Sequence, residues 1–119
     1  MVDDTAGGLV PAVPPVLIER TVRRFDPQRI ILFGSQARGD AGPDSDWDLL
    51  IIVDDDAPPE NLWLRTAYEA IMGTGIAADV VPVRAATFEY KRDVVNSISW
   101  FADTEGLVVY ERVAQHRAA

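Results

Sequence analysis

The sequence predicts an α/β (α+β) fold, in which helices flank a small mixed β-sheet. Apolar runs of strand length alternate with segments of helical periodicity, and glycines and prolines separate them. A length of 119 residues allows one hydrophobic core, and 48% apolar with 25% charged residues is ordinary for a folded domain. We expect a flexible leader over residues 1–13, one domain over 14–112 and a tail over 113–119.

The first half of the domain is predicted to be a helix followed by two strands. Apolar residues from Val16 to Phe25 lie roughly on one helical face, with prolines before and after them that suit the start and end of a helix. Residues 29–33 form a nearly continuous apolar run that ends at Gly34, which indicates a buried strand. After a turn-rich stretch, residues 46–53 are predicted as a second strand.

A second helix is predicted over residues 59–72, where large apolar side chains recur at helical spacing before two glycines. On such an amphipathic helix we expect Trp63 and Tyr68 to face the core, with a partner-binding surface as the alternative.

The remainder is predicted as a strand over 76–83, helix over most of 85–103 and a last strand over 107–110. The helix between strands 46–53 and 76–83 makes a crossover unit, so these two strands should be parallel.

The composition excludes several classes of chemistry. Without cysteine there are no disulfides, zinc–thiolate sites, iron–sulfur clusters or thiol nucleophiles. The single histidine, His116, excludes a histidine metal cluster and argues against a Ser-His-Asp triad. A net charge of −8 disfavours direct binding to nucleic acids. No apolar run reaches the ~20 residues that cross a bilayer, and the N-terminus lacks the basic residues of a signal peptide. We therefore expect a cytoplasmic protein without a membrane contact.

Two carboxylates mark the start of the second strand. Asp46 and Asp48 are separated by one residue, so in a strand they share a face and lie about 6.5–7 Å apart along the chain. Neighbouring carboxylates at the mouth of a buried strand repel each other and are costly to desolvate, unless a cation lies between them. All-oxygen ligands suit a hard ion such as Mg²⁺. The alternative is a solvated strand start.

A third carboxylate, Asp79, lies early in the strand over 76–83. If the two strands are parallel neighbours, Asp79 meets Asp46 and Asp48 at one edge of the sheet. Three such acids can hold two metal ions ~3.5–4 Å apart, the arrangement that supports in-line displacement at phosphorus. The alternative for Asp79 on its own is a strand-start or capping residue, which is the commoner role of an isolated aspartate.

The turn after the first strand has the character of a phosphate-binding segment. Gly34 allows a ligand to approach the backbone, and Ser35 offers a hydroxyl and an amide at the start of a short helix. Arg38 could add positive charge to a polyphosphate, and an exposed structural arginine is the alternative.

The combination of these motifs is more specific than each part. Gly34-Ser35, ten further residues and Asp46-Trp47-Asp48 resemble the G-S-x₁₀-D-x-D signature of the DNA polymerase β-like nucleotidyltransferases, and in particular their minimal nucleotidyltransferase branch. The resemblance extends from about residue 14 to the last predicted strand. It implies a polymerase β-like palm fold.

The resemblance also implies roles for individual residues. Gly34 and Ser35 match the turn that holds a nucleoside triphosphate, here ATP. Asp46 and Asp48 match the pair that binds two Mg²⁺ ions. Asp79 matches the third acid, which completes the metal site and can act as a general base.

Small single-domain members of this branch are typically antitoxins of helical HEPN ribonuclease toxins. The resemblance therefore implies transfer of AMP from ATP to a tyrosine of such a toxin, and a possible hetero-oligomer. Larger members hold their acceptor with a second, helical domain, so here we expect a partner, a second copy or a shallow face to hold it. Two alternatives stay open: a non-enzymatic antitoxin that masks its toxin, and a small-molecule nucleotidyltransferase of the aminoglycoside type.

Overall fold

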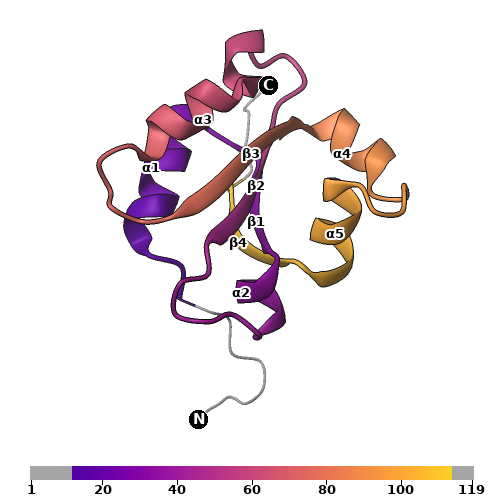
Figure 1. The fold of residues 1–119 in the computed structure, drawn as a ribbon. Helices are drawn as coiled ribbons and strands as arrows, with labels where there is room; N and C mark the ends of the chain where they lie inside the picture. The colour runs from indigo at the N-terminus through magenta and orange to yellow at the C-terminus, as the bar shows by residue number, and fades with distance from the viewer. Residues whose placement is uncertain (1–11, 114–119) are drawn as a thin grey trace.

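A single β-sheet organises residues 12–113, the part of the chain that this computed structural model describes (Figure 1). Its strands run in the order β3-β2-β1-β4. They are β1 (Arg29–Phe33), β2 (Trp47–Val53), β3 (Ala78–Arg84) and β4 (Leu107–Glu111). The strand β1 pairs antiparallel with β2 and with β4, whereas β2 and β3 are parallel. The predicted mixed sheet and the parallel crossover are confirmed.

Helices cover both faces of this sheet. Figure 1 shows α1 and α3 on one side of it and α4 and α5 on the other. The helical elements are α1 (Pro15–Phe25), α2 (Ser35–Arg38), the 3₁₀ helix η1 (Pro59–Leu62), α3 (Leu64–Ile71), α4 (Ala85–Lys91) and α5 (Ile98–Glu105). None of the helices within residues 12–113 has the length and apolar character needed to cross a membrane.

The central strand β2 explains why the core has two halves. Alternate side chains of a strand point to opposite faces of the sheet. The side chains that pack with α1 and α3 are Leu49, Ile51 and Val53. The side chains that pack with Phe88 of α4 and Ala102 of α5 are Leu50 and Ile52. All five strand residues are fully buried, which accounts for the uninterrupted apolar run in the sequence.

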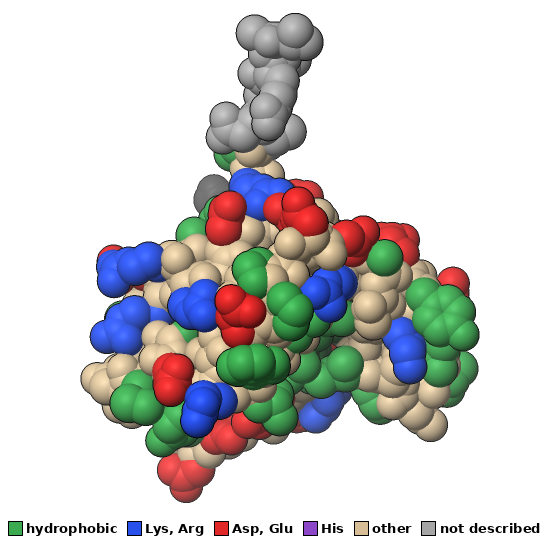
Figure 2. Space-filling view, turned by 90° about the horizontal axis from the view of Figure 1, so that it is seen from above, with side chains coloured by type: hydrophobic (Ala, Val, Ile, Leu, Met, Phe, Trp, Pro, Cys, Tyr) green, Lys and Arg blue, Asp and Glu red, His purple; other side chains and the backbone are tan. Residues whose placement is uncertain are grey.

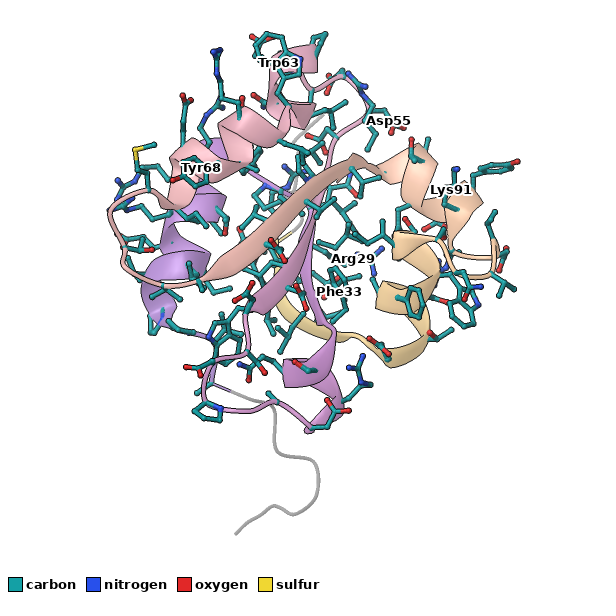
Figure 3. All side chains as sticks on the ribbon, in the orientation of Figure 1. Arg29, Phe33, Asp55, Trp63, Tyr68 and Lys91 are labelled. Carbon is teal, nitrogen blue, oxygen red and sulfur yellow. The ribbon has the colours of Figure 1, made fainter. Side chains whose placement is uncertain are left out.

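The helix predicted over 59–72 is divided, and the prediction that its aromatic residues face the core is wrong. Trp63 has extended backbone angles between η1 and α3, so the helical periodicity is interrupted there. The face of α3 that is buried consists of Thr66, Ala67 and Ile71. Trp63 is 53% exposed and Tyr68 66% exposed (Figure 3). A break of one residue therefore changes which side chains reach the sheet.

The surface carries side chains of several kinds. Figure 2 shows hydrophobic, acidic and basic side chains interspersed on the face seen there. The leader predicted over 1–13 and the tail over 113–119 lie mostly outside the described residues. Of the leader, Val13 packs against the core that contains α1.

Candidate functional site

Two carboxylates lie side by side at the N-terminal end of β2 and β3. The parallel register pairs Asp48 with Asp79 directly across the two strands. By strand alternation, Asp48 shares its face with Leu50 and Asp79 shares its face with Val81, and both of these pack on the side of α4 and α5. The crossover therefore brings together two acids that are separated by 30 residues of sequence.

The surroundings of the Asp48 carboxyl raise its pKa. Partial burial, followed by repulsion from Asp79 and a hydrogen bond with it, raises the pKa of Asp48 to about 6. The charge of Asp46 adds to this rise in pKa, and the guanidinium of Arg38 opposes it. The ionised form of Asp48 is thus disfavoured in this environment, and a cation bound between Asp48 and Asp79 would relieve the repulsion.

The third predicted acid, Asp46, lies two residues before Asp48. It directly precedes β2 and its side chain is exposed. As the side chains stand within residues 12–113, no three acidic or histidine side chains form a group that could hold one ion. The register pairs Asp48 with Asp79, and the charge of Asp46 acts on Asp48, but the three carboxylates do not form a three-ligand group in this conformation.

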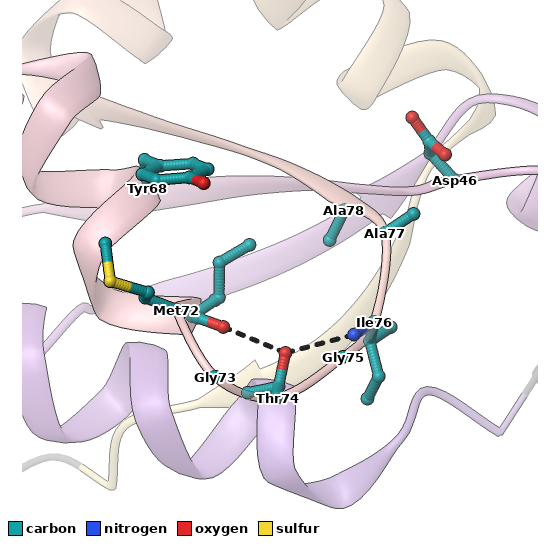
Figure 4. A pocket seen from close by; sticks show the side chains of 10 residues that line it. Asp46, Tyr68, Met72, Gly73, Thr74, Gly75, Ile76, Ala77 and Ala78 are labelled. Atoms are coloured by element: carbon teal, nitrogen blue, oxygen red, sulfur yellow. Dashed lines mark hydrogen bonds between the residues drawn. The ribbon is translucent and has the colours of Figure 1, made fainter.

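Asp46 is also at the rim of a surface pocket of about 440 Å³. This pocket lies between the end of α3 and the start of β3, and Figure 4 shows the loop that closes it. The Thr74 hydroxyl donates to the Ile71 carbonyl (2.9 Å) and accepts from the Ile76 amide (3.2 Å). Because α3 covers the opposite face of the sheet, this pocket is not centred on the Asp48 and Asp79 carboxylates.

Gly34 brings the turn after β1 against the Asp48 carboxylate. Its φ of 78° and ψ of −160° lie in a region that is essentially restricted to glycine. A Cβ atom at this position would overlap Oδ2 of Asp48. Antiparallel pairing explains the closeness, because Phe33, the residue before Gly34, pairs with Asp48. A glycine is therefore required here by backbone conformation and by space.

The predicted phosphate-binding residues follow directly in α2. Ser35 is the first residue of this helix, so its amide belongs to the turn whose N–H groups have no partner within a helix. Arg38 lies at the other end of α2 and donates from Nε to Asp40 (3.1 Å). It also donates from Nη1 to Oε2 of Glu105 (3.1 Å). Gly34, from which α2 continues, thus lies on one side of Asp48, and Asp79 lies on the other.

Glu105 is a residue near the site that the sequence did not reveal. It is the last residue of α5, and its Oε2 accepts a hydrogen bond from the Gly34 amide (2.9 Å) as well as from Arg38. A signal was present in the sequence: an acid at the C-terminal end of a helix is opposed by the helix dipole. A hydrogen-bond donor from another element is needed to stabilise such a carboxylate, and the sequence does not identify that donor.

The donor set fits a hard divalent cation. Carboxylate oxygens are the ligands preferred by Mg²⁺, and the register places the carboxylates of Asp48 and Asp79 directly across two neighbouring strands. Main-chain and arginine N–H donors lie on the adjacent side, at Ser35 and Arg38. Together these groups could hold a metal ion and an anionic ligand next to each other.

Comparisons with known proteins concern the family and the fold of the chain. A family model described as "Nucleotidyltransferase domain" matches residues 16–105. No curated protein gives a significant match. A chain of a toxin–antitoxin crystal structure with AMP-PNP is 20% identical, with a TM-score of 0.57 over 82% of this chain and 73% of that one. A protein assigned as a nucleotidyltransferase from Sulfolobus solfataricus is 17% identical, with a TM-score of 0.48 over 85% of this chain and 92% of that one. The first of these likenesses shows a shared fold.

Proposed function

Because the chain belongs to the nucleotidyltransferase domain family and has the polymerase β-like nucleotidyltransferase fold, we propose that it transfers AMP from ATP to a protein hydroxyl group. The acceptor in this proposal is a tyrosine of a partner HEPN-family ribonuclease toxin, for which the chain acts as the antitoxin. The shared fold with a chain from a toxin–antitoxin structure that contains AMP-PNP supports both the partner and the nucleotide. The net charge of −8 is compatible with a basic, RNA-binding partner.

One observation carries the proposal: Asp48 lies between Asp79 on one neighbouring strand and the Gly34 turn that follows the other. Nucleotidyl transfer needs a site for metal ions and a site for a triphosphate directly beside it. The carboxylates supply the first and the Gly34–Arg38 segment supplies the second. Asp48 is the residue that both sites share.

In this proposal the site residues bind either the phosphates of ATP or the metal ions. The Ser35 amide and hydroxyl, with the Arg38 guanidinium, hold the β- and γ-phosphates of ATP, which become the leaving pyrophosphate. Asp46 and Asp48 would hold two Mg²⁺ ions, and Asp79 would complete the site. When bound, these ions neutralise phosphate charge and lower the pKa of the attacking hydroxyl.

The reaction balances as an in-line displacement. The acceptor hydroxyl oxygen forms a bond to the α-phosphorus of ATP as the bond from that phosphorus to the bridging oxygen breaks. The pair of electrons leaves with pyrophosphate, and Asp79 receives the hydroxyl proton. In-line displacement requires pyrophosphate and the acceptor to lie on opposite sides of the α-phosphorus. Gly34 and Asp79, which we assign to these two groups, lie on opposite sides of Asp48.

Asp48→Asn tests the proposal directly. The variant keeps the shape of the side chain and removes its charge, so label transfer from α-³²P-ATP to the partner should be abolished while the fold is retained. Asp44→Asn, in an exposed turn close by, is the matched control and should transfer label at the wild-type rate. Transfer by Asp48→Asn at a rate like that of the wild type would exclude the assigned metal site.

A second candidate function is masking of the toxin by contact alone. The exposed aromatic side chains of Trp63 and Tyr68 favour it, because aromatic residues are enriched at protein interfaces. Neutralisation of the toxin by Asp46→Ala/Asp48→Ala without ATP would support masking. Loss of neutralisation in the same variant, with the complex still formed, would support transfer.

A further inference from the structure

The position of Glu105 is fixed by tight packing of the chain around it. The buried side chain of Ala102 in α5 packs against the sheet with Ile31 of β1. Immediately after Glu105, the Gly106 amide donates to the Ala102 carbonyl (2.9 Å). A Cβ atom at Gly106 would overlap both that carbonyl and the Ile31 side chain. The end of α5 therefore has little freedom to move away from β1, and the Glu105 side chain is only 21% exposed.

A single oxygen atom of Glu105 joins two parts of the proposed triphosphate site. Its Oε2 accepts from the Gly34 amide at 2.9 Å and from Nη1 of Arg38 at 3.1 Å. These bonds span 71 and 67 residues of sequence. Hydrogen bonds to a charged group are about twice as strong as neutral ones, so this is a substantial restraint.

The Gly34 turn and the Arg38 side chain both require a restraint to keep one conformation. Gly34 keeps a conformation that is open only to glycine, with its Cα against the Asp48 carboxylate. Arg38 is a long side chain at the surface, and ordering it costs rotamer entropy. Of its five N–H donors, Asp40 and Glu105 each take one. With only these two acceptors among residues 12–113, the other N–H donors of Arg38 are available to phosphate oxygens.

We infer that Glu105 is a positioning residue for nucleotidyl transfer, an inference that rests on the proposed function. Its carboxylate holds the Gly34 turn against Asp48 and sets the direction of the Arg38 guanidinium before ATP arrives. The competing physical effect is repulsion: a carboxylate near a triphosphate weakens its binding. The two effects predict opposite results when Glu105 is removed, so an experiment can separate them.

The test compares Glu105→Ala and Glu105→Gln with Asp103→Asn. Asp103 is on the same helix turn and pairs with Arg92 at 2.6 Å, so it is a matched control. The measurements are the affinity for AMP-PNP with Mg²⁺ by calorimetry, kcat and KM for ATP, and the amide proton resonance of Gly34 in protein without metal or nucleotide. That resonance reports on the hydrogen bond independently of activity.

For Glu105→Ala we expect AMP-PNP affinity to fall roughly 10- to 100-fold, the range for loss of a hydrogen bond to a charged group. KM for ATP should rise more than kcat falls, and the Gly34 resonance should move upfield. Glu105→Gln should recover part of the affinity, because its amide oxygen can still accept from Gly34. Asp103→Asn should match the wild type in each measurement.

Several outcomes would overturn the inference. One is an active wild type whose Glu105→Ala variant binds AMP-PNP equally well or more tightly. Another is a Gly34 resonance that does not move in that variant. Either result leaves the proposed function standing. A wild type that neither binds AMP-PNP nor transfers label to the partner would instead refute the proposed function, and this inference with it.

Discussion

Replacing Asp48 with asparagine should stabilise the metal-free protein at pH 7, although it removes the proposed activity. The cause is the pKa of Asp48, which partial burial and the neighbouring Asp79 raise from 3.8 to about 6. Between these two values the native protein binds a proton that the unfolded chain has already released. Stability therefore falls as pH rises from about 4 to about 6, and the full cost is present above pH 6.

The magnitude follows from the two pKa values. The difference between 3.8 and about 6 corresponds to at most about 3 kcal/mol. Asp48 is only partly buried, so screening by solvent reduces this to about 1–2 kcal/mol. Asparagine has a similar size and carries no charge. Its amide could also donate to Asp79, which adds to the stability of the variant.

Urea unfolding in EDTA measures the effect. The wild type and Asp48→Asn should differ by about 1–2 kcal/mol in the free energy of unfolding at pH 7, and the difference should shrink toward pH 4. The control Asp44→Asn, in an exposed turn, should stay within about 0.5 kcal/mol of the wild type. An Asp48→Asn protein that is less stable at pH 7, or a difference that is constant with pH, would refute the account of crowded carboxylates.

Two further predictions concern the same site. The affinity for Mg²⁺ should decrease below pH 6, by up to about tenfold per pH unit, because binding displaces one proton from Asp48. Calorimetry at pH 5 and pH 7 would measure this affinity. An affinity that does not change with pH would mean that Asp48 is not a ligand. Gly34→Ala should lower the free energy of unfolding by about 1–3 kcal/mol and abolish label transfer, because the new Cβ displaces the Asp48 carboxylate. Gly73→Ala is the control, because Gly73 has a φ of 88° and open space around it. This variant introduces backbone strain without a steric overlap. If both variants keep full transfer activity, the contact between Gly34 and Asp48 has no role in the reaction.

Local sequence was sufficient to predict most of the secondary structure. The strand predicted over 29–33 has those bounds in the structure, because a short apolar run closed by a glycine has few other ways to fold. The helix that ends before Pro27 and the short helix after Gly34 also form as predicted. The predicted proximity of Asp79 to Asp48 needed one more rule, the parallel crossover, and the register shows these residues directly paired.

The aromatic residues of the second predicted helix show where local reasoning failed. A prediction from periodicity assumes a continuous helix, and the extended backbone at Trp63 interrupts the helix. The Thr66 hydroxyl donates to the Glu60 carbonyl (2.7 Å) across the junction, which joins η1 to α3 after the break. The buried face of α3 consists of Thr66, Ala67 and Ile71, and Tyr68 lies outside this face.

By itself, the sequence determined the alternation of strands and helices, the paired acids Asp46 and Asp48, and the glycine turn at Gly34, because each of these depends on residues close together in the chain. The tertiary structure alone decided that Glu105 reaches Gly34 and Arg38. The physical reason is that such contacts depend on how α5 and the loops pack against the sheet. No spacing in the sequence encodes the distance between groups that are brought together only by folding.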